Sequence, residues 1–157
     1  MLGSSPSMTK VEKRAHCVNT EILDILQGNW DFERCVSYPT VSLKGTAVFE
    51  PLAKNTLSYH ESGTYVFDST EYDFFQKRTF YFENNSIVIF KNDGALLHQF
   101  DGINTLYPST STHLHLCGSD TYHCVLTLNS TINFSMHYSI KGPNKDYTIR
   151  TLYRKLS

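Results

Sequence analysis

Trp30, the single tryptophan of this chain, constrains the fold more than any other residue. It stands two positions after Gly28, between a short amphipathic segment and a long stretch in which apolar and polar residues alternate. Tyr and Phe supply the other aromatic rings, at 10 copies each, so one indole at this junction points to a specific structural position. Two arginines, Arg150 and Arg154, lie in the last alternating stretch. We predict that Trp30 is buried at one end of the fold, with Arg150 or Arg154 over its ring as a cation–π partner.

The segment before Trp30 predicts a short helix. Its apolar residues recur at helical spacing: Ile22, Leu23, Ile25 and Leu26. Thr20 is a suitable N-cap, and Gly28 ends the helix because glycine readily adopts positive φ values. Residues 1–17 are small and polar, and we expect them to form a flexible lead.

From Trp30 onward the apolar residues recur with a period of two, which indicates strands. Turn signals at 92–94 (Asn-Asp-Gly) and 142–144 (Gly-Pro-Asn) separate apolar runs, as in antiparallel hairpins. The segments with this pattern are 30–36, 45–50, 56–67, 72–82, 86–91, 95–100, 112–117, 122–128, 132–141 and 146–154. So many short strands favour closure, because a barrel leaves no exposed edge. We predict that residues 18–157 form a single all-β domain, an antiparallel β-barrel of about 8–10 strands with a short N-terminal helix.

The composition excludes some classes of partner. The chain has 157 residues, of which 40% are hydrophobic and 13% aromatic, as is typical of one folded domain. Its formal net charge of -1 provides no basic face for nucleic acid or an anionic membrane surface. We expect neither partner.

The N-terminal residues and the cysteines bear on location. Residues 1–13 contain no apolar segment of the kind found in signal peptides, so a cytoplasmic location is expected. In that compartment cysteines stay reduced. We therefore expect no disulfide among Cys17, Cys35, Cys117 and Cys124.

Arg34 is the most unusual residue of the first predicted strand. It shares a face with Trp30, and a guanidinium in an apolar interior is costly unless it is paired or holds an anion. Glu61, in phase with Tyr59 on a later strand, is the expected partner. Two interpretations remain open: a buried Arg34–Glu61 ion pair that braces the fold, or an Arg34 that binds an anionic ligand.

The most concentrated group of metal ligands and acid-base residues lies late in the chain. His113, His115 and Cys117 alternate and so face one side of a strand. With Asp120 or Cys124 from the following strand they could surround zinc or copper. Residues that follow one another on one face of a strand are spaced widely for a single ion, however, so we predict no metal site.

Three motifs make the chain resemble the lipocalin-like, or calycin, barrel superfamily. Gly28-Asn29-Trp30 matches the G-x-W that opens the first strand, Ser119-Asp120-Thr121-Tyr122 is similar to the later T-D-Y, and the C-terminal arginine matches the late cation. This resemblance implies a barrel that is closed at one end and holds a cavity.

A closer resemblance is to a family of uncharacterised intracellular barrel domains, and it runs from about residue 24 to the end. The family motifs are G-x-W-x-x-x-R, H-x-C-x-x-D-x-Y and G-P-x-K-D-Y. They correspond to Gly28, Trp30 and Arg34; His115, Cys117, Asp120 and Tyr122; and Gly142, Pro143, Lys145, Asp146 and Tyr147. Haem-binding barrels related to nitrobindin share the G-x-W, which leaves haem on His98, His115 or His137 as an alternative. We predict no cofactor.

The predicted function is that of an intracellular barrel that binds a small, partly apolar, anionic ligand in its cavity. Aromatic residues are abundant, and the chain lacks a G-x-S-x-G elbow and a glycine-rich phosphate loop. The predicted ligand contacts are Arg34, Tyr59, Glu61, His98, His115, Tyr122, Lys145 and Tyr153.

Two other functions stay open. The first is a small-molecule enzyme of isomerase, cyclase, lyase or hydrolase type. In this hypothesis His115 or His98 is the general base, Asp120 orients it, Tyr122 is the proton donor and Arg34 binds the anionic group of the substrate. The second is an interaction module that binds a partner protein through residues 104–112. That stretch is predicted to be the longest loop, either a solvated connection or a lid.

Overall fold

The computed structural model describes residues 21–156. They form a helix at 21–26 and ten antiparallel strands. The strands are β1 (Gly28–Ser37), β2 (Thr40–Ala53), β3 (Thr56–Phe67), β4 (Thr70–Glu83), β5 (Ser86–Lys91), β6 (Leu96–Phe100), β7 (Ser109–Cys117), β8 (Asp120–Leu128), β9 (Asn133–Gly142) and β10 (Lys145–Lys155). The predicted all-β fold with one short helix is confirmed. The proposed N-cap Thr20 and the lead at 1–17 lie outside the described residues.

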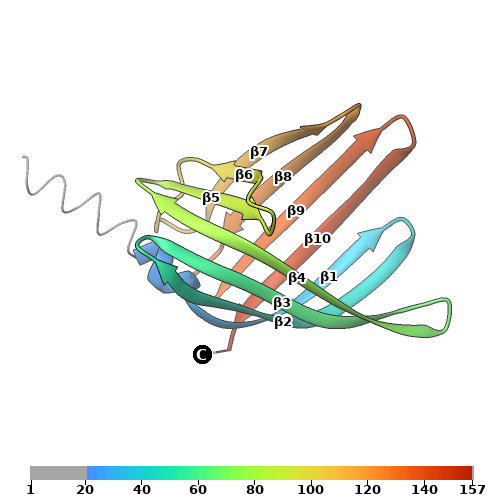
Figure 1. The fold of residues 1–157 in the computed structure, drawn as a ribbon, viewed down its shortest axis with the longest axis horizontal. Coiled ribbons are helices and arrows are strands. Elements are labelled where there is room, and N and C mark those ends of the chain that lie inside the picture. The colour runs from blue at the N-terminus through green and yellow to red at the C-terminus, as the bar shows by residue number, and fades with distance from the viewer. Residues whose placement is uncertain (1–20, 157) are drawn as a thin grey trace, which may run out of the picture.

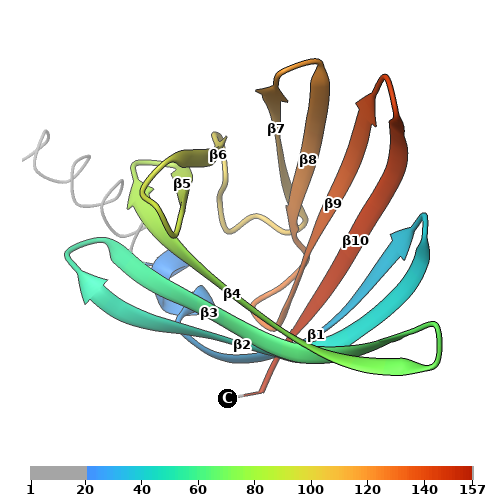
Figure 2. The same cartoon turned by 45° about the vertical axis from the view of Figure 1, so that its right-hand side comes forward.

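All ten strands belong to one sheet, in the order β6-β5-β4-β3-β2-β1-β10-β9-β8-β7. Strands that follow one another in the chain are neighbours in the sheet, apart from β6 and β7, and β1 also pairs with β10. The sheet curves until its two edge strands, β6 and β7, come round toward each other (Figures 1 and 2). Side chains bridge this seam, where Ser111 Oγ donates a hydrogen bond to the carbonyl oxygen of Asp101 at 2.6 Å. The fold is therefore a nearly closed barrel.

The period of two in the sequence divides the strands into an inner and an outer face. On β1, Trp30 and Phe32 are buried in the barrel, whereas Glu33 is exposed. Phe49 of β2 makes an edge contact with Phe80 of β4, with ring centroids 5.0 Å apart. Removing these rings from water provides the main driving force for the fold.

The helix and Trp30 close one end of the barrel. Trp30 is completely buried, its indole N–H donates to the carbonyl oxygen of Leu26 at 2.8 Å, and its ring contacts Phe134 edge-on at 4.8 Å. Ile22 and Leu26 of the helix are buried in the same core. The predicted burial of Trp30 at one end is confirmed.

The predicted cation partner of Trp30 is wrong. Lys155, directly opposite Trp30 in the β1–β10 register, places its Nζ 5.1 Å from the ring centroid. Arg154, one position earlier, points to the outer face and pairs with Asp31 at 3.5 Å, and Arg150 is exposed. The reason is the period of two, because only odd-numbered residues of β10 share the inner face with Trp30.

The connection between β6 and β7 is shorter than predicted, and it does not cover the mouth. Residues predicted as a loop at 104–112 include the first part of β7, which begins at Ser109. The backbone N–H of Ile103 bonds the carbonyl oxygen of Asn85 in the β4–β5 turn, so the connection lies at the closed end. This position rules out a lid formed by the predicted loop.

A close approach of β2 and β3 yields a first prediction. Gly45 and Gly63 are opposite each other, and a Cβ on Gly63 would lie 2.2 Å from the carbonyl oxygen of Lys44 and 2.8 Å from the Cα of Gly45. We expect Gly63→Ala to lower the free energy of unfolding by about 2–3 kcal/mol, measured by chemical denaturation. The exposed neighbour Ser62 is the control, and Ser62→Ala should change stability by less than about 0.5 kcal/mol. Equal stability of the two variants would contradict this steric account.

Candidate ligand cavity

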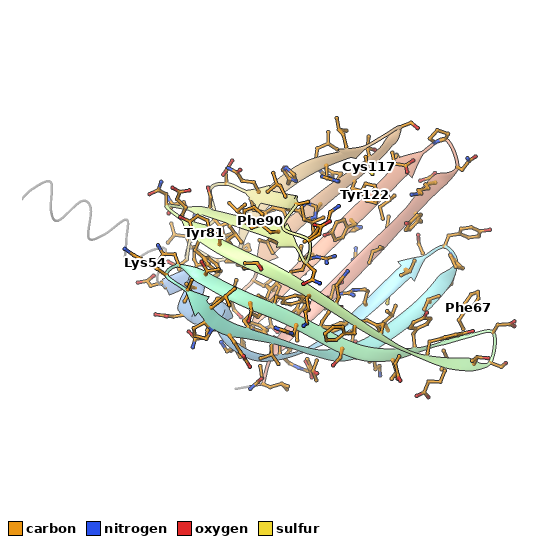
Figure 3. All side chains as sticks on the ribbon, in the orientation of Figure 1. Lys54, Phe67, Tyr81, Phe90, Cys117 and Tyr122 are labelled. Carbon is orange, nitrogen blue, oxygen red and sulfur yellow. The ribbon has the colours of Figure 1, made fainter. Side chains whose placement is uncertain are left out.

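A cavity of about 300 Å³ lies inside the barrel, away from the end closed by Trp30. Its wall is mostly aromatic and aliphatic, and it carries a few polar groups. The apolar lining residues are Phe80, Ile89, Leu97, Met136, Ile140 and Ile149. Tyrosines come from several strands: Tyr59, Tyr122, Tyr138, Tyr147 and Tyr153. Tyr122 on β8 is labelled in Figure 3. Apolar walls with a few placed polar groups are typical of small-molecule sites.

Arg34 and Glu61 form a bidentate ion pair on one wall of this cavity. Arg34 Nη1 and Nη2 donate to the two carboxylate oxygens of Glu61 at 2.6 and 3.1 Å. Arg34 Nε donates to Thr151 Oγ1 at 2.8 Å, and the Tyr59 hydroxyl donates to Glu61 at 2.7 Å. Glu61 is only 2% exposed. The first of the two interpretations of Arg34, a buried pair with Glu61, is therefore present in the structure.

The environment keeps Arg34 charged and the neighbouring tyrosines neutral. Burial by itself would lower the pKa of Arg34, but Tyr153 and Glu61 more than offset this effect, so its pKa lies above the ordinary value. Burial raises the pKa of Tyr59 and Tyr153. Most donors of the Arg34 guanidinium already have protein partners, so few remain for a ligand.

Arg78 of β4 is the cavity cation that the sequence analysis missed. It lines the cavity, and among residues 21–156 no carboxylate forms a salt bridge with it. With its amide turned so that the nitrogen faces Glu61 and the oxygen faces Arg78, Gln76 links Arg78 to the first pair, donating to Glu61 Oε1 at 3.3 Å and accepting from Arg78 Nη2 at 2.5 Å. Lys91 lies opposite Arg78 on β5, so two cations share one face. The alternation along β4 indicates that Arg78 faces the interior, because Arg78 and Gln76 are in phase with the buried Phe80 and Phe82.

A chain of polar side chains lies behind Tyr138, at the seam between β6 and β7. His98, which is completely buried, makes two contacts through its ring nitrogens. Its Nε2 lies 2.7 Å from the Tyr138 hydroxyl, and its Nδ1 lies 3.1 Å from Nδ1 of His113. Burial lowers the pKa of His98 to about 3, with His113, His115 and Arg78 contributing. Burial and His115 also lower the pKa of His113.

Lys145 binds two side chains at the rim of the cavity. Its Nζ pairs with Asp120 at 2.9 Å and donates to the Tyr122 hydroxyl at 3.1 Å. These hydrogen bonds, to Tyr122 and then Asp120, raise the pKa of Lys145. Gly142 allows this contact, since a Cβ there would lie 1.9 Å from an Asp120 carboxylate oxygen. The rim thus joins residues of the H-x-C-x-x-D-x-Y and G-P-x-K-D-Y motifs.

The residues of the enzyme hypothesis are only partly brought together. The ring of His115 lies 6.1 Å from that of Tyr122. Asp120 bonds Lys145, and within the described chain no hydrogen bond or salt bridge joins it to His115. A general base oriented by Asp120 is therefore not assembled in this geometry.

Among the described residues, the candidate metal ligands do not meet at one site, and one candidate haem ligand lies on the outer face. Within residues 21–156 no group of three His, Cys, Asp or Glu side chains is placed to hold a metal ion. Cys117 is exposed and Cys124 is buried, and burial raises the pKa of the Cys124 thiol to about 12. His137 is opposite Arg150 on the outer face. The described cysteines, Cys35 among them, are free thiols, and Cys17 lies outside the described residues.

Of the eight predicted ligand contacts, five line the cavity and three do not. The lining residues are Arg34, Tyr59, Glu61, Tyr122 and Tyr153. His98 lies behind Tyr138, His115 beside Tyr122, and Lys145 at the rim. The lining residues that the sequence analysis did not single out include Gln76, Arg78, Met136 and Tyr138.

The geometry defines an antiparallel β-barrel with an internal cavity. The sequence matches the model of a family of unknown function (DUF6314) over residues 26–155, and the chain belongs to this family. No curated protein matches it.

Solved structures with the same fold include the S-type phycobiliprotein lyase CPES from Guillardia theta. This lyase has a TM-score of 0.63 and 8% identity, and the match covers 93% of this chain and 97% of the lyase. A de novo designed fluorescence-activating β-barrel has a TM-score of 0.50 and 10% identity, over 86% and 97% of the two chains. At these identities the likeness concerns the fold alone. Within residues 21–156, no helix combines the length and apolar character needed to span a bilayer.

Proposed function

We propose that this protein binds a small, partly apolar anion inside the barrel, with Arg78 as the anion contact. The supporting observation is a cavity lined by apolar and tyrosine side chains that contains a guanidinium with no carboxylate partner among the described residues. A buried or half-buried cation without a counterion is costly. An anionic ligand would remove this cost.

Two further features support Arg78 rather than Arg34 as the contact. Lys91 is opposite Arg78 on the same face, and like charges that face each other across strands are destabilising. Arg34, by contrast, already has a bidentate partner in Glu61. Tyr138 and Gln76 lie on the lining near Arg78 and supply polar groups that can orient the ligand.

The test uses two dyes of similar size and different charge. The anion 8-anilinonaphthalene-1-sulfonate (ANS) and the uncharged N-phenyl-1-naphthylamine are titrated into the protein and followed by fluorescence. We expect Arg78→Met to weaken ANS binding about tenfold, because a charge-assisted contact of about 1.4 kcal/mol is lost. Binding of the uncharged dye should change little.

Arg150→Met is the matched control, since Arg150 is exposed on the outer face of β10. This variant should bind both dyes as the unmodified protein does. If Arg78→Met binds ANS with unchanged affinity, Arg78 is not the anion contact. If neither dye binds the unmodified protein, the binding function is rejected.

A further inference from the structure

We propose that the barrel takes up one proton with its anionic ligand, and that the proton is held by the His98–His113 pair at the seam between β6 and β7. This inference rests on the proposed function of the cavity. It adds a pH dependence to that function, with tighter anion binding in acid.

The two imidazoles form a site for one additional proton. With their Nδ1 atoms 3.1 Å apart, one ring must donate and the other accept, so two neutral rings satisfy the contact when one carries its proton on Nδ1 and the other on Nε2. A single added proton preserves it, since an imidazolium can donate to a neutral imidazole. Two added protons would place two donors face to face. The pair therefore accommodates one positive charge but not two.

When no ligand is present, the groups around the pair disfavour the addition of even one proton. Arg78 of β4 and His115 of β7 both act against protonation of His98. Tyr138 of β9 and Cys124 of β8 are neutral, since burial raises the pKa of each. Among the described residues, Asp101 is the one group that favours a positive charge on the pair, and it acts on His113. The surroundings are thus positive on balance.

An anion bound at Arg78 would make the surroundings of the pair less positive and so favour its protonation. His98 is opposite Ile89, which is opposite Phe80, and Arg78 is the next inward residue of β4 toward the mouth. The Tyr138 hydroxyl, hydrogen-bonded to His98, belongs to a residue that lines the cavity beside the site. A negative charge there would neutralise Arg78 and favour the imidazolium. By linkage, a ligand that raises the pKa of the pair binds more tightly once the pH falls below the raised pKa of the ligand-bound barrel.

The experiment measures the affinity for ANS, an anion at every pH used, from about pH 7.5 down to about pH 5. We expect at least about fivefold tighter ANS binding at the acid end, with no such change for the uncharged N-phenyl-1-naphthylamine. Calorimetry in buffers of different ionisation enthalpy should show uptake of up to about one proton per ANS bound in acid. Circular dichroism confirms that the barrel stays folded over this range.

Two variants test the site of the proton. His98→Asn should flatten the pH dependence of ANS affinity, and His113→Asn, a milder change at the edge strand, should reduce it. The control is His123→Asn, because His123 is exposed on β8, and it should keep the full pH dependence.

The outcomes separate the two proposals. ANS binding that needs Arg78 but shows neither pH dependence nor proton uptake overturns the coupling and leaves the binding function intact. A pH dependence that survives in both His98→Asn and His113→Asn also overturns it. ANS binding that does not respond to Arg78→Met overturns both proposals together.

Discussion

Replacing Trp30 by alanine is expected to lower the free energy of unfolding by about 3–5 kcal/mol. The indole is fully buried, and its loss removes the edge contact with Phe134 at 4.8 Å and the hydrogen bond to Leu26 at 2.8 Å. It also leaves a cavity where the helix packs against the barrel. Chemical denaturation followed by circular dichroism measures the change.

Two single substitutions, Lys155→Met and Arg154→Met, show which cation contacts Trp30. Lys155 stacks on the ring and donates to the carbonyl oxygens of Ile25 and Gln27 at the end of the helix. Lys155→Met should therefore cost about 1–2 kcal/mol, whereas Arg154→Met, which removes a 71% exposed side chain, should cost less than about 0.5 kcal/mol. The reverse order would contradict the assignment of Lys155.

Arg34→Met is the second change with a large expected effect. It leaves the carboxylate of Glu61 at 2% exposure without its counterion, and breaking a buried pair in this way costs about 3–5 kcal/mol. Tyr59 still donates to Glu61, which favours the lower end of this range. The free energy of unfolding at neutral pH is the measurement.

The double variant Arg34→Met, Glu61→Met is the control for this prediction. Replacing both members of a buried ion pair by apolar side chains is often close to neutral. We expect the double variant to recover most of the stability that Arg34→Met loses. If the single and double variants are equally unstable, the loss reflects packing around Arg34 rather than the unpaired carboxylate.

Alternation along the strands was enough to predict much of this molecule. It placed Arg34 and Glu61 on inner faces, and the pair they form was one of the two stated interpretations. The same rule contained the answer for Trp30, since Lys155 rather than Arg154 is in phase with the inner residues of β10. The sequence analysis predicted an arginine over Trp30 because a family motif has one near the C-terminus. The period of two along β10 instead indicates Lys155.

Other features depend on distances between strands that the sequence does not encode locally. Arg78 is one alternating residue among many, and its significance comes from the absence of a salt bridge between it and any carboxylate of the described chain. His98 and His113 meet because the two edges of the sheet come round toward each other. Asp120 bonds Lys145 instead of His115 because the β7–β8 and β9–β10 hairpins are adjacent at the rim.

The sequence by itself therefore determined the strand pattern, the inner and outer faces, the helix and the burial of Trp30. These features follow from local periodicity, because backbone geometry alone sets which residues share a face. Only the tertiary structure decided which charges are paired, which cation is left in the cavity and which histidines touch. Those outcomes depend on the register and curvature of the whole sheet, which bring together side chains far apart in the chain.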